Sequence, residues 1–315
     1  MLCFDKLKMK TDIKNINNID VNSFIANTQN NELISYKYTQ TRPYNLSIRI
    51  NYKYNELIIE FTSKILKDEA VKLINKNNVQ QCLENINILG ICQLNIPAIL
   101  NDAEVLKCDV TKDVIFENIS NITNYVITHI KNNRKWVRKP YKLNGVVLEK
   151  VASTPRHKKR LTIYDKQNEL LRKENADFLN GLARKSAYLE YFRNRVRFEL
   201  NLDTKEQIRK SLNINNTALF EVLSANNNPI LNTLEEILDF TISKVPVNLS
   251  LRDYERMTFL QAYNNDLQEV EWKIRTLVSS NTSIKKTMEP YRELLERLNK
   301  KVPVIPLREL LEETT

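Results

Sequence analysis

Several stretches within the first two hundred residues alternate apolar and polar side chains, as a β-strand with one buried face requires. In Arg195–Leu202 every second residue from Val196 onward is apolar, and the residues between are polar. Short connections separate these stretches, so we expect a mainly antiparallel α+β sheet. The predicted strands cover Tyr44–Tyr54, Glu56–Thr62, Glu104–Thr111, Gly145–Val151, Arg160–Lys166 and Arg195–Leu202.

Apolar residues at spacings of three and four predict helices between and after these strands. From Thr204 onward this helical pattern dominates, so we predict two parts: a sheet domain over 1–203 and a helical C-terminal region over 204–315. The predicted helices cover Lys67–Asn75, Val79–Asn85, 119–131, Asp177–Tyr191, Leu251–Val278 and Glu289–Lys300.

Composition excludes several classes of protein. Only 3 Gly occur in 315 residues, so the chain has no glycine-rich phosphate loop and is not a P-loop or Rossmann enzyme. Four Cys without CxxC spacing and only 2 His exclude the common zinc sites. No signal peptide or membrane span is visible, so we expect an intracellular, cytoplasmic protein.

The middle of the chain is strongly basic. Residues 131–173 contain 14 Lys and Arg against 3 Asp and Glu, whereas the net charge of the whole chain is +10. Trp136, Tyr141 and Tyr164 lie among these cations, a combination that suits a groove for single-stranded nucleic acid. A basic loop that is only solvated stays open as the alternative.

The polar faces of the predicted strands carry groups that could perform chemistry. Tyr164 shares a face with Lys166, and carboxylates occupy the polar faces of three other strands, namely Glu60, Asp109 and Glu199. Converging carboxylates bind Mg²⁺ or Mn²⁺, and a tyrosine next to a cation can act as a nucleophile. Together these groups predict phosphodiester transesterification, although polar outer faces are also ordinary in antiparallel sheets.

Two segments of the chain resemble the replication initiators of filamentous phages, the gene II and X proteins, and their relatives on Rep-trans plasmids. The segment from Arg156 to Leu170, RHKKRLTIYDKQNEL, and the later segment RVRFELN from Arg195 to Asn201 carry the resemblance. Two upstream strands, EFTSKIL from Glu60 and CDVT from Cys108, extend it over roughly residues 1–215. The His-hydrophobic-His motif of many other rolling-circle nickases is absent.

The resemblance implies that the chain nicks one strand of origin DNA and starts rolling-circle replication of a phage or plasmid. Tyr164 would attack and retain the 5′-phosphate, with Lys166 as its electrostatic helper. Asp109, Glu199 and Glu60 would hold Mg²⁺ or Mn²⁺, and a host helicase is a candidate partner. The residues predicted to bind DNA are Arg156, His157, Lys158, Lys159, Arg160 and Arg197.

Other classes of protein remain open. A non-enzymatic initiator that binds the origin, of the winged-helix type, would explain the charge without needing the tyrosine. A tyrosine recombinase also forms phosphotyrosine, but it requires Arg and His around a nucleophile on helices, and the chain has 2 His. A purely structural protein would leave the basic segment unexplained.

Overall fold

A computed structural model describes residues 1–116, 118–131, 135–142, 145–151, 159–238, 249–278, 283–299 and 307–312. The chain divides into two compact units. The first contains Met1–Thr123, Lys131–Leu238 and Leu307–Thr315, and the second contains Asn124–Ile130 and Asp239–Pro306. The boundary predicted at residue 203 is therefore displaced, because 204–238 belong to the first unit.

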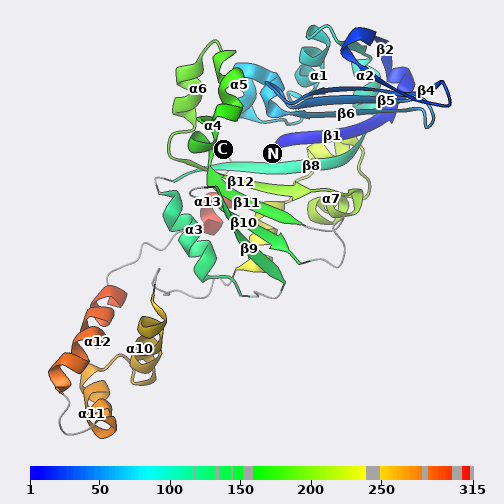
Figure 1. Ribbon diagram of the computed structural model, residues 1–315. Coiled ribbons are helices and arrows are strands. Elements are labelled where there is room, and N and C mark those ends of the chain that lie inside the picture. Colours follow the sequence, from blue (N-terminus) through cyan, green and yellow to red (C-terminus); the bar gives the residue numbers. More distant parts are fainter. Residues whose placement is uncertain are drawn as a thin grey trace. The chain divides into compact units, whose positions relative to one another are not determined.

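The first unit is built on one large antiparallel sheet, which confirms the predicted α+β class. Its strands lie in the order β3-β4-β5-β6-β1-β8-β12-β11-β10-β9 (Figure 1). A separate pair joins β2 (Ile16–Ile19) to β7 (Cys92–Leu94). The strands of the large sheet are β1 (Phe4–Asp12), β3 (Ile25–Gln29), β4 (Glu32–Gln40), β5 (Leu46–Asn51), β6 (Glu56–Thr62), β8 (Glu104–Ile115), β9 (Trp136–Tyr141), β10 (Gly145–Lys150), β11 (Arg160–Asp165) and β12 (Arg195–Leu202).

Most of the predicted strands are confirmed, including the hairpin of β5 and β6. The strand β1 was not predicted, although it lies in the middle of the sheet between β6 and β8. Its buried side chains, Phe4, Leu7 and Met9, are fully covered. The sequence at the start of the chain therefore contributes a central strand, and this strand changes which side chains surround the site.

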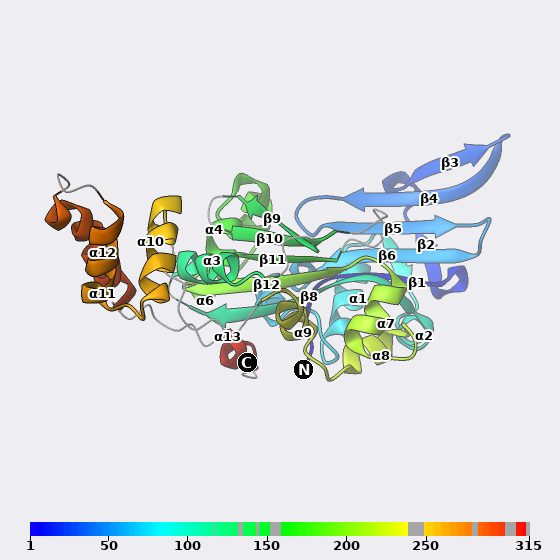
Figure 2. The ribbon, with the colours of Figure 1, turned by 90° about the horizontal axis from the view of Figure 1, so that it is seen from below.

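Helices cover the sheet and connect its strands (Figure 2). The helices α7 and α9 pack against β8 and β12, whereas α4 packs against β11 and β12. The helical elements of the first unit are η1 (Ile13–Asn15), η2 (Val21–Ser23), η3 (Ser63–Lys72), α1 (Val79–Ile88), α2 (Ile96–Asp102), α4 (Lys166–Leu170), η5 (Lys173–Asn175), α5 (Ala176–Asn180), α6 (Lys185–Tyr191), α7 (Lys205–Leu212), α8 (Leu219–Ser224), α9 (Pro229–Ile237) and α13 (Leu307–Glu312). The helix α3 (Ile119–Thr128) begins in the first unit and belongs to the second from Asn124 onward.

In the part of the second unit after α9 that the structure describes, three helices share a small apolar core. They are α10 (Leu251–Ala262), α11 (Leu267–Leu277) and α12 (Ile284–Asn299). Met257, Leu260, Val270 and Met288 are buried among them. Within the described part of the chain, we find no helix with the length and apolar character needed to cross a bilayer.

Candidate active site

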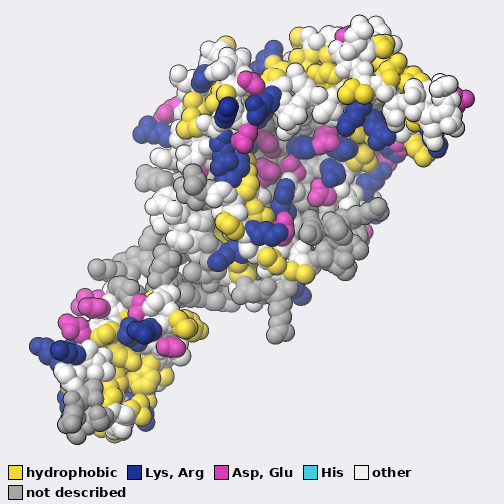
Figure 3. Space-filling view, in the orientation of Figure 1, with side chains coloured by type: hydrophobic (Ala, Val, Ile, Leu, Met, Phe, Trp, Pro, Cys, Tyr) yellow, Lys and Arg dark blue, Asp and Glu magenta, His cyan; other side chains and the backbone are white. Residues whose placement is uncertain are grey.

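The register of three neighbouring strands brings the predicted tyrosine and two predicted carboxylates to one face of the sheet. Glu199 on β12 pairs with Thr111 on β8 and with Thr162 on β11. Asp109 lies two residues before Thr111 and Tyr164 lies two residues after Thr162, and residues two apart in a strand share a face, so the two side chains lie on either side of Glu199. Acidic side chains gather near the middle of the molecule in Figure 3, with Lys and Arg side chains on both sides of them.

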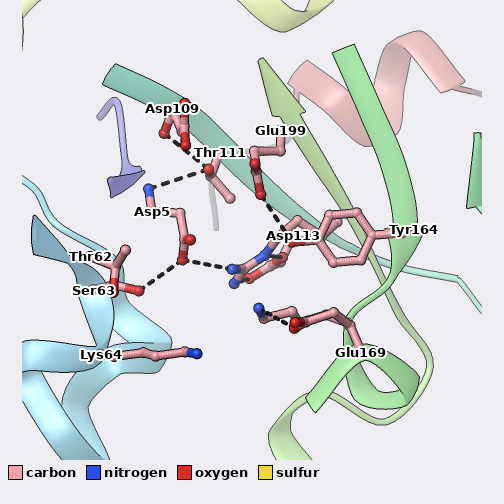
Figure 4. A network of polar contacts seen from close by, with 12 residues as sticks. Asp5, Thr62, Ser63, Lys64, Asp109, Thr111, Asp113, Tyr164, Glu169 and Glu199 are labelled. Atoms are coloured by element: carbon pink, nitrogen blue, oxygen red, sulfur yellow. Dashed lines mark hydrogen bonds and ion pairs between the residues drawn. The ribbon is translucent and has the colours of Figure 1, made fainter. Parts of the chain in front are cut away.

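Tyr164 and Glu199 are in direct contact. The phenol of Tyr164 donates a hydrogen bond to Oε2 of Glu199 at 3.0 Å (Figure 4). Tyr164 is only 5% exposed, and its burial together with the charge of Glu199 raises its pKa well above the ordinary value. Arg197 acts in the opposite direction and lowers that pKa. Glu199 was predicted only as a metal ligand, but this contact also places a proton acceptor on the tyrosine.

Asp109 lies beside Glu199 and carries an unusual pKa for a carboxyl. Burial and the charge of Glu199 raise the pKa of Asp109 to about 7, although a hydrogen bond from Asn201 Nδ2 to Asp109 Oδ1 at 2.5 Å favours the ionised form. Burial and the charge of Asp5 likewise raise the pKa of Glu199. The site therefore concentrates negative charge that the described side chains only partly neutralise.

Arg197, which the sequence predicted to bind DNA, is buried in the sheet. Its side chain is 1% exposed and is held by two carboxylates of the site. Nε and Nη2 of Arg197 donate to the two oxygens of Asp113 at 2.7 and 2.8 Å, and Nη1 donates to Asp5 Oδ1 at 2.9 Å. The charged end of Arg197 is therefore covered from solvent and paired with Asp113 and Asp5.

Lys166 is close to the tyrosine, but it is not on the same strand. The strand β11 ends at Asp165, whose side chain caps the short helix α4 by accepting from the backbone N–H of Asn168. Lys166 is the first residue of that helix, and its Nζ lies 5.8 Å from the centroid of the Tyr164 ring. The Nζ also forms an ion pair with Glu169 at 2.7 Å, so part of its charge is already compensated.

A second tyrosine lies against the first. The rings of Tyr141 on β9 and Tyr164 are 5.0 Å apart between centroids. Tyr141 pairs with Gly145, where an added Cβ would lie 2.7 Å from the backbone oxygen of Ile163. Burial and the charges of Glu169 and Glu199 raise the pKa of Tyr141 to about 12. Tyr141 therefore covers one side of Tyr164, and it is only partly buried.

Glu60 lies on the same face of the sheet but is separated from Asp109 and Glu199. The unpredicted strand β1 lies between β6 and β8, and its Lys6 and Lys8 both form ion pairs with Glu60. Burial opposes ionisation, but Lys6 and Lys8 lower the pKa of Glu60 below its ordinary value. The prediction that Glu60 joins the other two carboxylates is therefore wrong, because two lysines already bind its carboxylate.

The remaining residues predicted to bind DNA are only partly described. Arg156, His157 and Lys158 lie outside the described residues. Lys159 is partly buried, and burial lowers its pKa. Arg160 is exposed, and its Nε donates to Asn201 Oδ1 at 2.7 Å, one hydrogen bond away from Asp109. Arg160 is thus close to the site and still open to solvent.

The predicted metal can be compared with the donor set. Among the described residues, no group of three His, Cys, Asp or Glu side chains is arranged to hold a metal ion. Asp109 and Glu199 nevertheless supply two neighbouring hard oxygen donors whose mutual repulsion a cation would relieve. Mg²⁺ typically uses one or two carboxylates together with substrate phosphate oxygens and waters, so this pair fits such an ion better than a cage made only of protein ligands.

Several residues of the site were missed in the sequence. Asp5 comes from β1, Asp113 from the end of β8, and Glu169 from α4. Ser63 Oγ donates to Asp5 Oδ1 at 2.8 Å, and Lys64 Nζ donates to Asn175 Oδ1 at 2.7 Å. The alternation in FDKLKMKTD, Phe4–Asp12, was the available signal for β1 and hence for Asp5.

The chain matches no protein-family model, no curated protein and no solved structure. The function is therefore inferred from the geometry of the site and from the resemblance in the strands.

Proposed function

We propose that this chain is a DNA-nicking replication initiator that uses Tyr164 as its nucleophile. The observation that carries the proposal is the hydrogen bond from the Tyr164 phenol to Glu199 on the face that also holds Asp109. A general base must lie within about 2.6–3.2 Å of the proton that it removes, and Glu199 satisfies this condition. The resemblance to filamentous-phage initiators supports the same role for Tyr164.

The proposed reaction is a transesterification at one phosphodiester of DNA. The phenol oxygen forms a bond to phosphorus while its proton passes to Glu199. The bond between phosphorus and the 3′-oxygen breaks, and the leaving oxygen keeps the electron pair and takes a proton from solvent. The products are a 5′-phosphotyrosine ester and a free 3′-hydroxyl. The ester can be attacked later by a 3′-hydroxyl, so resealing a strand needs no nucleotide.

Positive charge next to the phenol favours the ionised tyrosine that forms during attack. Arg197 lowers the pKa of Tyr164, and Lys166 lies over its ring. Asp113 and Asp5 fix the guanidinium of Arg197, so we propose that Arg197 is an electrostatic helper. Asp109 and Glu199 would hold Mg²⁺ or Mn²⁺, which would offset charge on the phosphate oxygens when bound.

The proposed setting is rolling-circle replication of a phage or plasmid in the cytoplasm of a bacterial host. Origin DNA, single-stranded or locally melted, is the proposed substrate, and a host helicase is a proposed partner that would unwind the duplex from the free 3′-hydroxyl. None of the site residues named above belongs to the second unit.

The burial of Tyr164 favours a second candidate function. A phenol that is 5% exposed and hydrogen-bonded is also what a structural tyrosine looks like, and a non-enzymatic initiator that binds the origin would need no reactive group.

One experiment separates the two functions. The protein is incubated with Mg²⁺ and circular single-stranded phage or plasmid DNA, then denatured and examined for a protein–DNA adduct. We expect a covalent adduct for the wild type and none for Tyr164→Phe. DNA binding with no adduct under these conditions supports the non-enzymatic initiator.

A further inference from the structure

A second group of charges lies on the face of the sheet that holds Tyr164. The register places Lys6 beside Asp109, Lys8 beside Glu60, and Lys37 beside Arg49, so each of these pairs lies on this one face. We call this group the cationic strip. It extends from β8 across β1 and β6 to β5 and β4, with its cations on the strands other than β6, and consists of Lys6, Lys8, Lys10, Lys37, Arg49 and Lys107.

Two cross-strand pairs in the cationic strip bring like charges face to face. Lys37 on β4 is directly opposite Arg49 on β5, and Lys8 on β1 is directly opposite Lys107 on β8. Like charges directly opposite each other destabilise an antiparallel pair, whereas opposite charges stabilise it. Lys8 and Lys107 each have a carboxylate partner, so the repulsion that an anionic ligand would relieve is chiefly that between Lys37 and Arg49.

The charges of the cationic strip are unequally compensated. Glu60 forms ion pairs with Lys6 and Lys8, Lys10 with Glu56, and Lys107 with Asp203. Neither Lys37 nor Arg49 has an ion pair with any residue that the structure describes, and both are exposed. The far end of the strip therefore offers two uncompensated cations to solvent.

We propose that the cationic strip binds the phosphate backbone of the single-stranded DNA that leads away from Tyr164. The strip is continuous with the site, because Lys6 pairs with Asp109 across β1 and β8. From β11 to β4 the sheet spans six strand spacings, about 29 Å at ~4.8 Å each. This choice of ligand rests on the proposed function. The charge and the length of the path suit a run of phosphates.

The first test uses Lys37→Glu, which should change stability and binding in opposite directions. The new carboxylate faces Arg49, so a repulsive pair becomes an attractive pair and the thermal midpoint should rise. The affinity for a fluorescent oligothymidylate should fall at least tenfold at low salt, because one cation is lost and an anion is added. Lys285→Glu, an exposed change of the same charge on α12, is the matched control and should leave the affinity within twofold.

The second test measures how binding depends on salt. For single strands, each phosphate that a protein neutralises contributes about 0.7 to the slope of log affinity against log salt. Replacing Lys37 and Arg49 together by Gln should lower that slope by about 1.4. An unchanged affinity and slope in this double variant would overturn the proposal, as would binding of an acidic peptide in preference to the oligothymidylate.

The strip and the nicking reaction can fail separately. The Tyr164→Phe protein should bind oligothymidylate with the wild-type affinity and slope, so the strip can be measured in a protein that cannot nick. If the wild type does not nick DNA but the strip variants lose affinity for it, the binding role of the cationic strip is supported and the proposed reaction is wrong. If the strip variants bind and nick DNA like the wild type, the binding role of the cationic strip is wrong and the proposed reaction is unaffected.

Discussion

The hydroxyl of Tyr164 donates to Oε2 of Glu199 across two adjacent strands, β11 and β12. A sheet fixes the spacing of neighbouring side chains more tightly than a loop does, so the proton acceptor is already in place before substrate binds. This relationship makes Glu199 the residue on which the proposed chemistry most depends. Glu60 differs from Glu199 in this respect, because Lys6 and Lys8 form ion pairs with its carboxylate.

The first prediction concerns the nucleophile. Tyr164→Phe removes one oxygen and leaves the ring packed against Tyr141, so folding and DNA binding should be retained while covalent adduct formation is lost. Losing one hydrogen bond should cost about 0.5–1.5 kcal/mol of unfolding free energy. Mass spectrometry of the wild-type adduct should locate the nucleotide on the peptide that contains Tyr164. The matched control is Tyr141→Phe, which should still form the adduct. Loss of the adduct in this control would show that Tyr141, and not Tyr164, is the nucleophile.

The second prediction concerns the metal. EDTA should abolish nicking, and Mg²⁺ or Mn²⁺ should restore it. Asp109→Asn keeps the side-chain volume and the contact with Asn201 but removes the charge, so nicking should fall at least a hundredfold. Glu60→Gln is the control, because Lys6 and Lys8 already occupy that carboxylate, and it should nick within threefold of the wild type. Full nicking activity of Asp109→Asn in EDTA would contradict the role of Asp109 as a metal ligand.

The third prediction concerns the pH dependence of stability. The pKa of Asp109 is about 7 in the folded chain against an ordinary 3.8, so the folded state binds the proton more tightly. Without metal, stability should therefore fall as pH rises from about 4 to about 7. At about 1.36 kcal/mol per pKa unit, the cost at pH 8 is on the order of 4 kcal/mol, and Asp109→Asn should remove it.

Thermal unfolding of wild type and Asp109→Asn from pH 4 to pH 8 checks this prediction. The thermal midpoint of the variant should rise relative to that of the wild type as pH rises. At pH 8, Mg²⁺ should raise the thermal midpoint of the wild type more than that of the variant. Parallel curves for the two proteins would show that Asp109 titrates near its ordinary pKa.

The fourth prediction concerns the buried ion pair. Asp113→Ala removes both hydrogen bonds from Nε and Nη2 of Arg197 and leaves a buried cation with Asp5 alone. Breaking a buried ion pair typically lowers the unfolding free energy by about 3–5 kcal/mol. Urea unfolding, monitored by circular dichroism, can measure this loss. The control is Glu206→Ala, which removes an exposed i,i+4 pair with Lys210 and should cost about 0.5 kcal/mol or less. Equal losses in the two variants would contradict the role given to Asp113.

The faces of β8, β11 and β12 could be predicted because alternation in an isolated strand already fixes which residues share a side. Alternation does not reveal which strands are neighbours, so Glu60 was grouped with Asp109 although β1 lies between their strands. Lys166 continues the alternation of Thr162 and Tyr164, but Asp165 caps a helix there and ends the strand.

The ion-pair partners of Arg197 could not be predicted from the sequence, for a different reason. Asp113 and Asp5 are 84 and 192 positions away along the chain, and only the assembled sheet brings them to the guanidinium. The boundary at residue 203 failed similarly, since an amphipathic helix shows an apolar face whether it packs on the sheet or on other helices.

The position of β1 has a consequence for how the protein is made. β1 is synthesised long before β8, one of its two neighbours in the sheet, and β8 must in turn pair with β12. Contacts between segments so far apart in sequence form slowly, and domains fold as units after their last strand is available. A nascent chain that ends before β12 carries Asp5 and Asp109 but lacks Arg197 and Glu199. Under the proposed function, the site that would cut DNA is therefore incomplete until β12 has been synthesised.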